Sequence, residues 1–579
     1  MGETILSIHD GHTATAAIIE NGRILACLSE ERLNRIKEWG GVPRLAVREV
    51  LKIAGKSPED IDYVVVPSYI NPVTSMEAGR KSIPRRIFGI VTRFVPRELL
   101  RSNIWVKPAV ALLKKFRRTQ EILNCIREIG IDADIEFCEH HLAHAATAFY
   151  TKWFKSDETL VITADGSGDA VSGTISIGKD YEIQRFVEVS NYNSIGELYS
   201  RVTEFLGMKP LSHEYKVMGL APYAKEKYTQ GTYEKFKRMI RISPKNPLVY
   251  ENISGAWKWQ YLDLFRKVLD RERFDNIAGG LQRFFEELLC RWIRNAIEET
   301  GINDIVLAGG VFMNVKANQK ILHMDEVNNF FVFPSCGDES LAIGAGLLKY
   351  VEICLDSGKK PKPEPLGPIY FGPEYKEEDI ENSLRAINAR KKYNVEKVKD
   401  IDKFVGEMVA EGKVVARFSG RCEWGARALG NRSILADARN TDVIRKINEA
   451  VKMRDFWMPF APSILKEREK DYLVNPKEFK APYMIISFDT TEHGRKTLKA
   501  AIHQYDFTAR PQVVEKSWNP GYYKVLKTFE KETGEGGFLN TSFNLHGQPI
   551  VCSPMDALWT LENTGLENLA LGEFFISKK

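Results

Sequence analysis

Three histidines lie within five positions of one apolar stretch, CEHHLAHAATAFY, at residues 138–150. His140 and His144 are four residues apart, so on a helix they would project from one face, one turn apart, as two ligands of one metal ion require. His141 would point elsewhere. The spacing alone leaves two interpretations open, a metal site or a capped, hydrogen-bonded helix start.

Two aspartates are candidates for completing a metal site. Asp165 follows the apolar run TLVIT and Asp338 follows FFVFPSCG, so both are expected at the ends of strands that open on one cleft. Two imidazoles with two carboxylates suit iron, zinc or manganese better than calcium, which prefers oxygen ligands only. The alternative is that both aspartates are turn residues or helix N-caps.

Two glycine-rich turns, ADGSGD (164–169) and AGGVFMN (308–314), also follow apolar runs. Backbone N–H groups in such turns can approach a phosphate because no Cβ atom stands in the way. Neither turn has the Walker lysine pattern, and GxGxxG is absent. Together they predict a nucleotide site, with contacts from Gly166, Gly168, Gly309, Gly310 and Asn314.

The C-terminal part of the chain is dense in arginine. Four arginines fall within the sixteen residues 417–432, and only Glu423 opposes them. Guanidinium groups bind phosphate through paired hydrogen bonds, whereas a solvated basic face normally carries interspersed glutamates. We therefore predict an anion site, with LNTSFN (539–544) adding amide and hydroxyl groups. Its candidate residues are Arg417, Arg421, Arg427, Arg432, Ser433, Lys452, Arg454 and Arg510.

The elements that would position these residues occur in two copies. Residues 4–29 read as strand, turn, strand, turn, strand, and residues 159–186 repeat that order. Apolar spacing predicts a helix over 279–301. The paired layout resembles the actin and sugar-kinase type of α/β fold, in which the turn of each hairpin faces a nucleotide phosphate.

At 579 residues the chain is too long for one ordinary core. The Pro-, Gly- and Lys-rich stretch 355–375 predicts a linker. We expect an α/β protein with a duplicated actin-like domain over 1–360 and a smaller α/β domain over 361–579.

Composition excludes several classes of protein. The apolar fraction is 44%, the net charge is +5, and the eight cysteines form no CxxC pair, so neither a disulfide framework nor a zinc ribbon is indicated. No run of about eighteen apolar residues occurs, and we expect a soluble cytoplasmic protein without a membrane span. The basic segment 80–118 is compatible with an acidic ligand, a membrane surface, nucleic acid or a solvated helical face.

The chain resembles the NodU/CmcH family of O-carbamoyltransferases over essentially its whole length. The resemblance is carried by motifs in family order: GHTATAAIIENGRILACLSEERLNRIK, HHLAHAA, SIGELYSRVTEFLG, EYKVMGLAPY, LAGGVFMN, GDESLAIGAG, GARALGNRSIL, FAPSIL and LNTSFN. It implies a first domain similar to the universal threonylcarbamoyl-transfer protein, which holds Fe²⁺ and ATP, and a second, YrdC-like domain. In the family, carbamoyl phosphate is broken down at the C-terminal site and ATP adenylates the carbamate, after which a substrate hydroxyl takes the carbamoyl group.

The resemblance also implies roles for single residues. His140, His144, Asp165 and Asp338 match the metal positions, which favours the metal site, and His12 matches the histidine that meets the acceptor hydroxyl. Lys452 and Arg454 form a KxR pattern like the one that holds substrate in the synthase domain. Arg417, Arg510, Asn540 and Asn544 are expected around carbamoyl phosphate and ATP. The chain departs from many members in having His12-Thr13 at the first motif and Gly425-Ala426-Arg427 for GPR.

The expected function is therefore ATP-dependent O-carbamoyl transfer to a small-molecule hydroxyl, such as that of a sugar. Fe²⁺ or another divalent ion is the expected cofactor, with Mg²⁺ as an accompanying ion, and a homodimer is the base-rate expectation. Two other enzymes stay open, a tRNA threonylcarbamoyl transferase and an actin-fold sugar kinase, although a nucleic-acid partner is not expected. A non-enzymatic ATP-binding scaffold would not need intact histidines, aspartates and arginines.

Overall fold

Two units divide the chain. The computed structural model describes residues 3–70 and 106–579, with side chains of the helix at 106–129 described from Arg118 onward. Unit 1 comprises Met1–Glu31 and Glu38–Leu366, and unit 2 comprises Arg32–Lys37 and Gly367–Lys579. The sequence places a boundary at 360/361 and gives no sign that Arg32–Lys37 belongs with the C-terminal residues.

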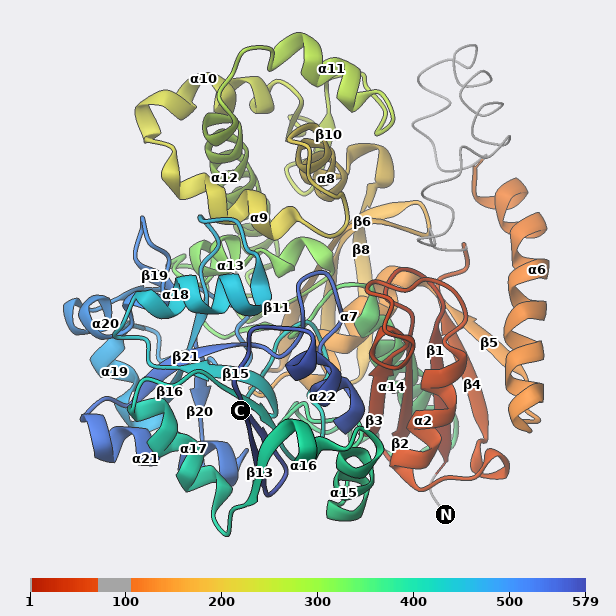
Figure 1. Ribbon diagram of the computed structural model, residues 1–579. Coiled ribbons are helices and arrows are strands. Elements are labelled where there is room, and N and C mark those ends of the chain that lie inside the picture. Colours follow the sequence, from red (N-terminus) through yellow and green to blue (C-terminus); the bar gives the residue numbers. More distant parts are fainter. Residues whose placement is uncertain (1–2, 71–105) are drawn as a thin grey trace. The chain divides into compact units, whose positions relative to one another are not determined.

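The first sheet of unit 1 begins with three consecutive antiparallel strands, as alternating apolar runs and the Asn21-Gly22 turn require. The strand order is β3-β2-β1-β4-β5, and β1, β4 and β5 run parallel. The strands are β1 (Thr4–His9), β2 (Thr15–Glu20), β3 (Arg23–Ser29), β4 (Tyr63–Pro67) and β5 (Ile135–Cys138). They lie near the N-terminus in Figure 1.

The second sheet of unit 1 repeats this topology. Its order is β12-β11-β6-β7-β8, with β6, β7 and β8 antiparallel and β6, β11 and β12 parallel. The strands are β6 (Glu158–Gly168), β7 (Val171–Lys179), β8 (Glu182–Ser190), β11 (Ile305–Ala308) and β12 (Phe330–Val332). The duplicated α/β layout predicted from the sequence is confirmed.

Two helices of unit 1, α7 (His140–Thr151) and α14 (Leu341–Asp356), pack closely against each other. A Cβ atom at Gly344 would overlap the carbonyl of Ala143, so this glycine is what allows the two helix backbones to touch. The remaining elements are α1 (Glu31–Asn34), α2 (Arg44–Ala54), α6 (Val106–Ile129), α8 (Ile195–Phe205), α9 (Glu214–Leu220), α10 (Glu226–Lys237), β9 (Ile240–Ile242), β10 (Tyr250–Asn252), α11 (Tyr261–Val268), α12 (Phe274–Thr300) and α13 (Val315–Leu322). Helix α12 contains the predicted helix 279–301 except for its last residue.

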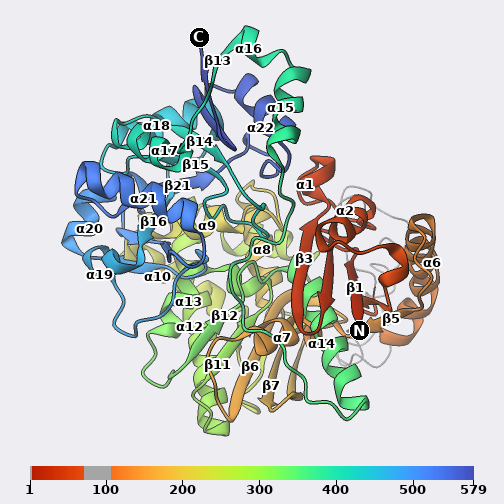
Figure 2. The ribbon, with the colours of Figure 1, turned by 90° about the horizontal axis from the view of Figure 1, so that it is seen from below.

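Unit 2 is built on an eight-stranded mixed sheet of order β13-β23-β22-β14-β15-β21-β16-β20. Its strands are β13 (Tyr393–Lys397), β14 (Val415–Phe418), β15 (Arg432–Ala436), β16 (Ala461–Leu465), β20 (Gln512–Val514), β21 (Gly537–Ser542), β22 (Asn568–Leu571) and β23 (Phe574–Lys578). A small sheet, β17 (Leu473–Val474), β18 (Phe488–Thr490) and β19 (Thr508–Ala509), lies apart from it. Figure 2 shows helix α21 (Pro520–Thr533) beside β16 and β21.

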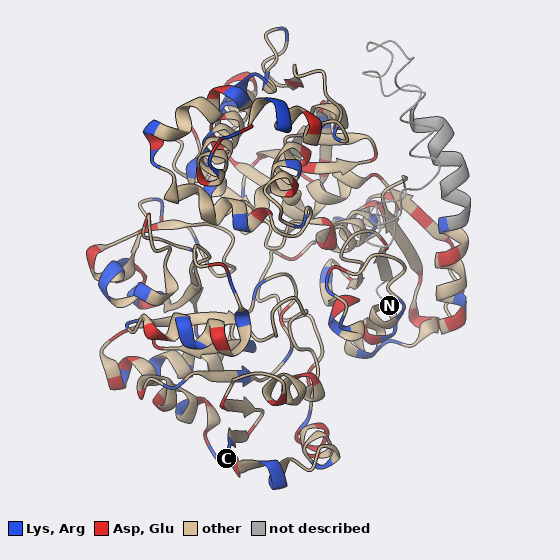
Figure 3. Ribbon diagram, turned by 45° about the horizontal axis from the view of Figure 1, so that its top comes forward, with Lys and Arg blue, Asp and Glu red and all other residues tan. Residues whose placement is uncertain are grey.

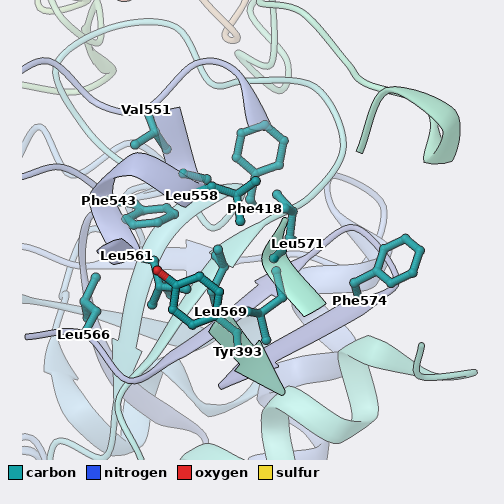
Figure 4. Packing of buried hydrophobic residues seen from close by; sticks show 14 of the residues in the cluster. Tyr393, Phe418, Phe543, Val551, Leu558, Leu561, Leu566, Leu569, Leu571 and Phe574 are labelled. Atoms are coloured by element: carbon teal, nitrogen blue, oxygen red, sulfur yellow. The ribbon is translucent and has the colours of Figure 1, made fainter. Parts of the chain in front are cut away.

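Apolar side chains of helix α22 (Pro554–Glu562) and of the sheet form a core of unit 2. Leu558 and Leu561 meet Phe418, Phe543 and Leu569 there, all almost fully buried (Figure 4). The other helices of the unit are α15 (Glu377–Ala386), α16 (Ala389–Lys392), α17 (Ile401–Ala410), α18 (Asp442–Ile447), α19 (Glu469–Tyr472) and α20 (Glu492–Thr497).

Charged residues of both signs are interspersed along the helices (Figure 3). Within the described ranges, no helix has the length and apolar character needed to cross a bilayer. Residues 80–105 of the basic segment 80–118 lie outside the described residues, and residues 106–118 fall in helix α6. The side chain of Arg118 is buried and paired rather than solvated.

Candidate functional site

The histidine-rich stretch forms the first turn of helix α7. Glu139 caps the helix by accepting a hydrogen bond from the Leu142 N–H at 2.6 Å. His140 and His144 project to one side, while His141 turns away to contact the Thr163 hydroxyl and the Val171 carbonyl. The two interpretations left open by the sequence are thus compatible, because a capped helix start also aims two imidazoles at one point.

Two carboxylates meet these imidazoles. The Nε2 atom of His140 lies 3.5 Å from Asp165 Oδ2 and 3.8 Å from Asp338 Oδ1, and His144 Nε2 lies 3.7 Å from the same Asp338 oxygen. One ligand atom from each of the four residues falls within 4.8 Å of the others. Asp165 comes from the end of β6 and Asp338 from the turn just before α14. These four residues could therefore hold one metal ion.

The ring nitrogens of the two histidines support this assignment. His140 Nε2 and His144 Nε2 are buried and make no hydrogen bond within the described chain, although buried polar atoms are rarely left so. The opposite nitrogens are held, His140 Nδ1 by the Ser68 hydroxyl at 2.8 Å and His144 Nδ1 by the Ser340 hydroxyl at 3.4 Å. Metal-ligating histidines are typically fixed in this way through the nitrogen that does not bind the metal.

Electrostatics couples the four groups. Burial disfavours a charged His140, yet the carboxylates of Asp165 and Asp338 outweigh it and raise its pKa to about 9. Burial likewise opposes ionisation of Asp165 and Asp338, but the neighbouring imidazoles hold both carboxyl pKa values below their usual range. A cluster that keeps two carboxylates ionised and attracts positive charge suits a divalent cation.

Sequence reasoning missed the residues that orient the ligands. Asp169 accepts hydrogen bonds from the backbone N–H groups of Tyr69, Ile70 and His140. Arg118 forms a buried pair with Asp10 at 2.5 Å and donates to the Ser68 carbonyl, next to the hydroxyl that holds His140. Asp169 stands in a recognised turn, but no sequence pattern links Ser68 or Arg118 to the histidines.

His12 lies on the turn between β1 and β2. Its Nδ1 contacts the Thr13 hydroxyl at 3.1 Å, and its carbonyl accepts a hydrogen bond from His9 Nε2 at 3.1 Å. His9 is fully buried, its Nδ1 is without a partner in the described chain, and burial lowers its pKa to about 4. His9 is therefore neutral, and the negative charge of Asp338 only partly opposes the lowering of its pKa. The sequence reasoning did not place His9 in the site.

The two glycine-rich turns lie side by side because β6 and β11 are parallel neighbours. Gly310 N–H donates to Asp165 Oδ1 at 3.1 Å, and Gly309 adopts a positive φ of 101° against the Ala164 carbonyl. Gly168 packs on His140, and Gly166 faces open space. Asn314 caps α13 and exchanges two hydrogen bonds with Gln282. Nucleotide contacts from these residues stay a prediction.

A second cluster lies in unit 2 around Lys452. This lysine is buried, and its ammonium donates to Asn544 Oδ1 at 2.6 Å, to the Asn544 carbonyl at 3.1 Å and to the Ser542 hydroxyl at 3.0 Å. It has no carboxylate partner in the described chain. Burial, then the charge of Arg454, then that of Lys37 lower its pKa well below the ordinary value.

Arg510 extends this cluster. Its pKa is lowered by burial and by the charges of Arg427 and Arg454, and no ion pair to Arg510 exists among the described residues. Arg454 donates to the Pro459 carbonyl and the Thr541 hydroxyl, both at 3.1 Å, and packs on the Phe460 ring. Lys452 and Arg510, two buried cations with no ion pair among the described residues, belong to a cluster of like charge that a bound anion would stabilise.

The other residues predicted for the C-terminal anion site make hydrogen bonds or ion pairs with groups of the protein itself. Arg417 pairs with Asp402 at 2.7 Å and donates to the Gly430 carbonyl at 2.8 Å. Arg432 stacks on Phe418 and donates to backbone carbonyls, and the Ser433 hydroxyl accepts the Gly430 N–H at 3.0 Å. Arg421 likewise donates to the carbonyls of Gly372 and Phe371. These side chains shape the 419–432 loop that carries Arg427.

Asn540 offers a different group. Its amide nitrogen has three acceptors, the Ala428 carbonyl, the Ser463 hydroxyl and the Gln512 side-chain oxygen, at 3.1–3.2 Å. Its Oδ1 is buried and accepts no hydrogen bond from the described chain. Asn540 Oδ1 can therefore take an N–H donor.

Comparisons with known proteins give matches along most of the chain. Residues 4–347 match the family "Carbamoyltransferase N-terminus", and residues 406–578 match "Carbamoyltransferase C-terminus". An uncharacterized protein of Methanocaldococcus jannaschii is 33% identical over 97% of this chain and 96% of its own length. Nodulation protein NolNO of Sinorhizobium fredii is 32% identical, covering 99% of this chain and 79% of that protein. Nodulation protein U of the same organism is 24% identical over 93% of each chain.

Likeness to solved structures is weak. Full-length HypF in a phosphate- and nucleotide-bound form shares 12% identity, with a TM-score of 0.34, over 62% of this chain and 47% of that one.

Proposed function

The chain belongs to the carbamoyltransferase family, and from this premise we propose that it is an ATP-dependent O-carbamoyltransferase that uses carbamoyl phosphate and a small-molecule hydroxyl acceptor. The carbamoyltransferase class is shown by the family and its relatives. The use of ATP and carbamoyl phosphate, the metal and the acceptor are the parts we propose.

The observation that carries the proposal is the cation cluster of unit 2. Lys452 and Arg510 are desolvated, lack carboxylate partners in the described chain, and share the neighbour Arg454. Carbamoyl phosphate and ATP both supply the phosphate charge that such a site needs. Asn540 Oδ1 supplies an acceptor for which the NH₂ group of a carbamoyl moiety is a fitting donor.

The proposed first reaction takes place in unit 2. Water cleaves carbamoyl phosphate to carbamate and phosphate. A carbamate oxygen then attacks the α-phosphorus of ATP, the bond to the β-phosphate breaks, and pyrophosphate leaves as carbamoyl-adenylate forms. Lys452, Arg454 and Arg510 bind the phosphate oxygens and stabilise the charge that builds on the leaving pyrophosphate.

The second reaction uses groups of unit 1. The acceptor oxygen attacks the carbamoyl carbon, its proton passes to a base, and AMP leaves. His12 is the proposed base because an imidazole nitrogen can accept a proton and because it lies half-buried on a turn. His140, His144, Asp165 and Asp338 would hold a divalent ion, iron, zinc or manganese by ligand type, which supplies Lewis-acid polarisation or anchors a phosphate.

The test is the half-reaction without acceptor. The Fe²⁺-loaded full-length protein is incubated with ATP and carbamoyl phosphate, and pyrophosphate, carbamoyl-adenylate and AMP are sought by mass spectrometry. We expect all three in the wild type and in Lys403→Met, a surface control on α17, and none in Lys452→Met. ADP instead of AMP would overturn the proposal in favour of a sugar kinase, and absence of products in the wild type would remove carbamoyl-adenylation altogether.

A further inference from the structure

The segment Arg32–Lys37 belongs to unit 2, although the residues on both sides of it belong to unit 1. The chain leaves unit 1 after Glu31 and re-enters it at Glu38. The two ends are joined there, because the Glu38 N–H donates to Glu31 Oε2 at 2.7 Å. The segment, whose first three residues belong to helix α1, therefore follows a short closed path that we call the Arg32–Lys37 loop, and it carries three cationic side chains.

Two of these side chains fix the loop in unit 2. Arg32 is buried and donates to the Gly425 carbonyl at 2.5 Å. Arg35, at a positive φ of 61°, donates to the carbonyls of Ile550 and Pro549 at 2.7 and 2.8 Å. Hydrogen bonds from charged donors to carbonyls are among the stronger ones in proteins, so the loop is firmly held.

The backbone that receives these hydrogen bonds is the backbone that builds the cation cluster. Gly425 stands two residues before Arg427. On the other side, the Asn544 amide closes the turn before Pro549 by donating to the Gln548 carbonyl at 2.7 Å, and its Oδ1 holds Lys452. The anchored loop thus contacts the stretch that carries Arg427 and the stretch that carries Asn544, the hydrogen-bond partner of Lys452.

The third cation, Lys37, is not used as an anchor. It is exposed, and its ammonium makes no hydrogen bond or ion pair within the described chain. Its charge nevertheless acts on buried Lys452, together with that of Arg454. An exposed lysine usually turns toward solvent or a carboxylate, whereas this one is carried on a fixed loop to a cluster of like charge.

We propose that Lys37 is a phosphate-binding residue of the unit 2 site, delivered from the N-terminal part of the chain by the Arg32–Lys37 loop. Its ligand is a phosphate or pyrophosphate group. The inference rests on the proposed function only in taking that site to bind phosphorylated substrates. Without a ligand, Lys37 adds repulsion to the cluster; with one, it adds a further donor and a further positive charge.

The experiment measures pyrophosphate binding to the full-length protein by calorimetry, without carbamoyl phosphate or acceptor. We expect Lys37→Met to weaken binding about tenfold and to make it less sensitive to salt, because one cation no longer meets the anion. Lys37→Arg should bind within about twofold of the wild type, and Lys403→Met should bind unchanged. Arg35→Met should also weaken binding although Lys37 is still present, because the loop loses its anchor.

If Lys37→Met binds pyrophosphate as tightly as the wild type does, the inference is overturned. The loop would then have a structural role only. The Michaelis constants then separate the sources of the phosphate. A rise for ATP alone assigns Lys37 to the nucleotide, and a rise for carbamoyl phosphate alone assigns it to the other substrate. Lys37-dependent pyrophosphate binding in a protein that makes no carbamoyl-adenylate would retain this inference while the proposed function fails.

Discussion

Gly168 packs against the imidazole of His140 so closely that a Cβ atom at position 168 would overlap the ring. We predict that Gly168→Ala displaces His140, lowers divalent-metal affinity at least tenfold and costs about 1–3 kcal/mol of unfolding free energy. Gly166→Ala is the matched control, because nothing lies within 4 Å of a Cβ there. Metal titration by calorimetry and thermal melting of both variants test this. Equal metal affinity in the two variants would contradict the assignment of His140.

Asp338 is the carboxylate that both histidines face. Asp338→Asn should reduce Fe²⁺ or Zn²⁺ affinity about a hundredfold, because the amide keeps the shape but removes the charge. The rise in melting temperature that a bound ion gives the wild type should vanish with it. Asp157→Asn, at an exposed position of unit 1, should keep both. Retention of metal affinity in Asp338→Asn would mean that Asp338 is not a ligand.

Arg417 and Arg510 should respond in opposite ways to substitution by methionine. Arg417→Met breaks a partly buried pair with Asp402, removes the hydrogen bond to the Gly430 carbonyl and should cost about 2–4 kcal/mol of unfolding free energy. Arg510→Met removes a desolvated cation that repels Arg427 and Arg454, so it should leave stability unchanged or raise it by about 1 kcal/mol, while weakening pyrophosphate binding. Chemical denaturation and calorimetry separate the two effects, and a destabilised Arg510→Met would argue for a structural role instead.

Lys152, which lies outside both candidate sites, should make the stability of the fold depend on pH. Burial lowers its pKa to about 8, while its ammonium still lies over the Phe149 ring. Because the folded pKa is below the unfolded value of 10.5, the unfolded chain binds more protons between these values, and the contribution of Lys152 to stability rises with pH across about 8 to 10.5. Lys152→Met should therefore raise the melting temperature at pH 7, with a gain that shrinks toward pH 10.5. A pH-independent gain would contradict the shifted pKa.

The sequence predicts much of unit 1 because its signals are local. Strand-turn-strand order, apolar spacing and the HxxxH pair all act over a few residues, and the duplicated sheets and helix α7 follow from them. Residues that serve the site from a distance carry no such signal. Ser68 and Arg118 reach His140 and Asp10 only through the tertiary fold.

The arginine cluster shows a second limit. The sequence predicts the same anion-binding role for Arg417, Arg432 and Arg510. The structure pairs Arg417 with Asp402 and Arg432 with backbone carbonyls, whereas Arg510 lies close to the charges of Arg427 and Arg454. Only the positions of potential partners, such as Asp402 across a helix–strand contact, separate these outcomes. The composition shows that side chains able to bind phosphate are present. The fold determines which of them pair with groups of the protein.

Chain connectivity limits how this enzyme can be taken apart. The backbone crosses between the units after Glu31, after Lys37 and after Leu366, so unit 2 is not one contiguous stretch of the gene. A fragment starting at Gly367 would leave behind the loop that clasps Gly425 and Ile550. Shuffling C-terminal halves between relatives therefore exchanges an incomplete module, and a faithful chimera must also carry the codons for residues 32–37 from the donor of that half.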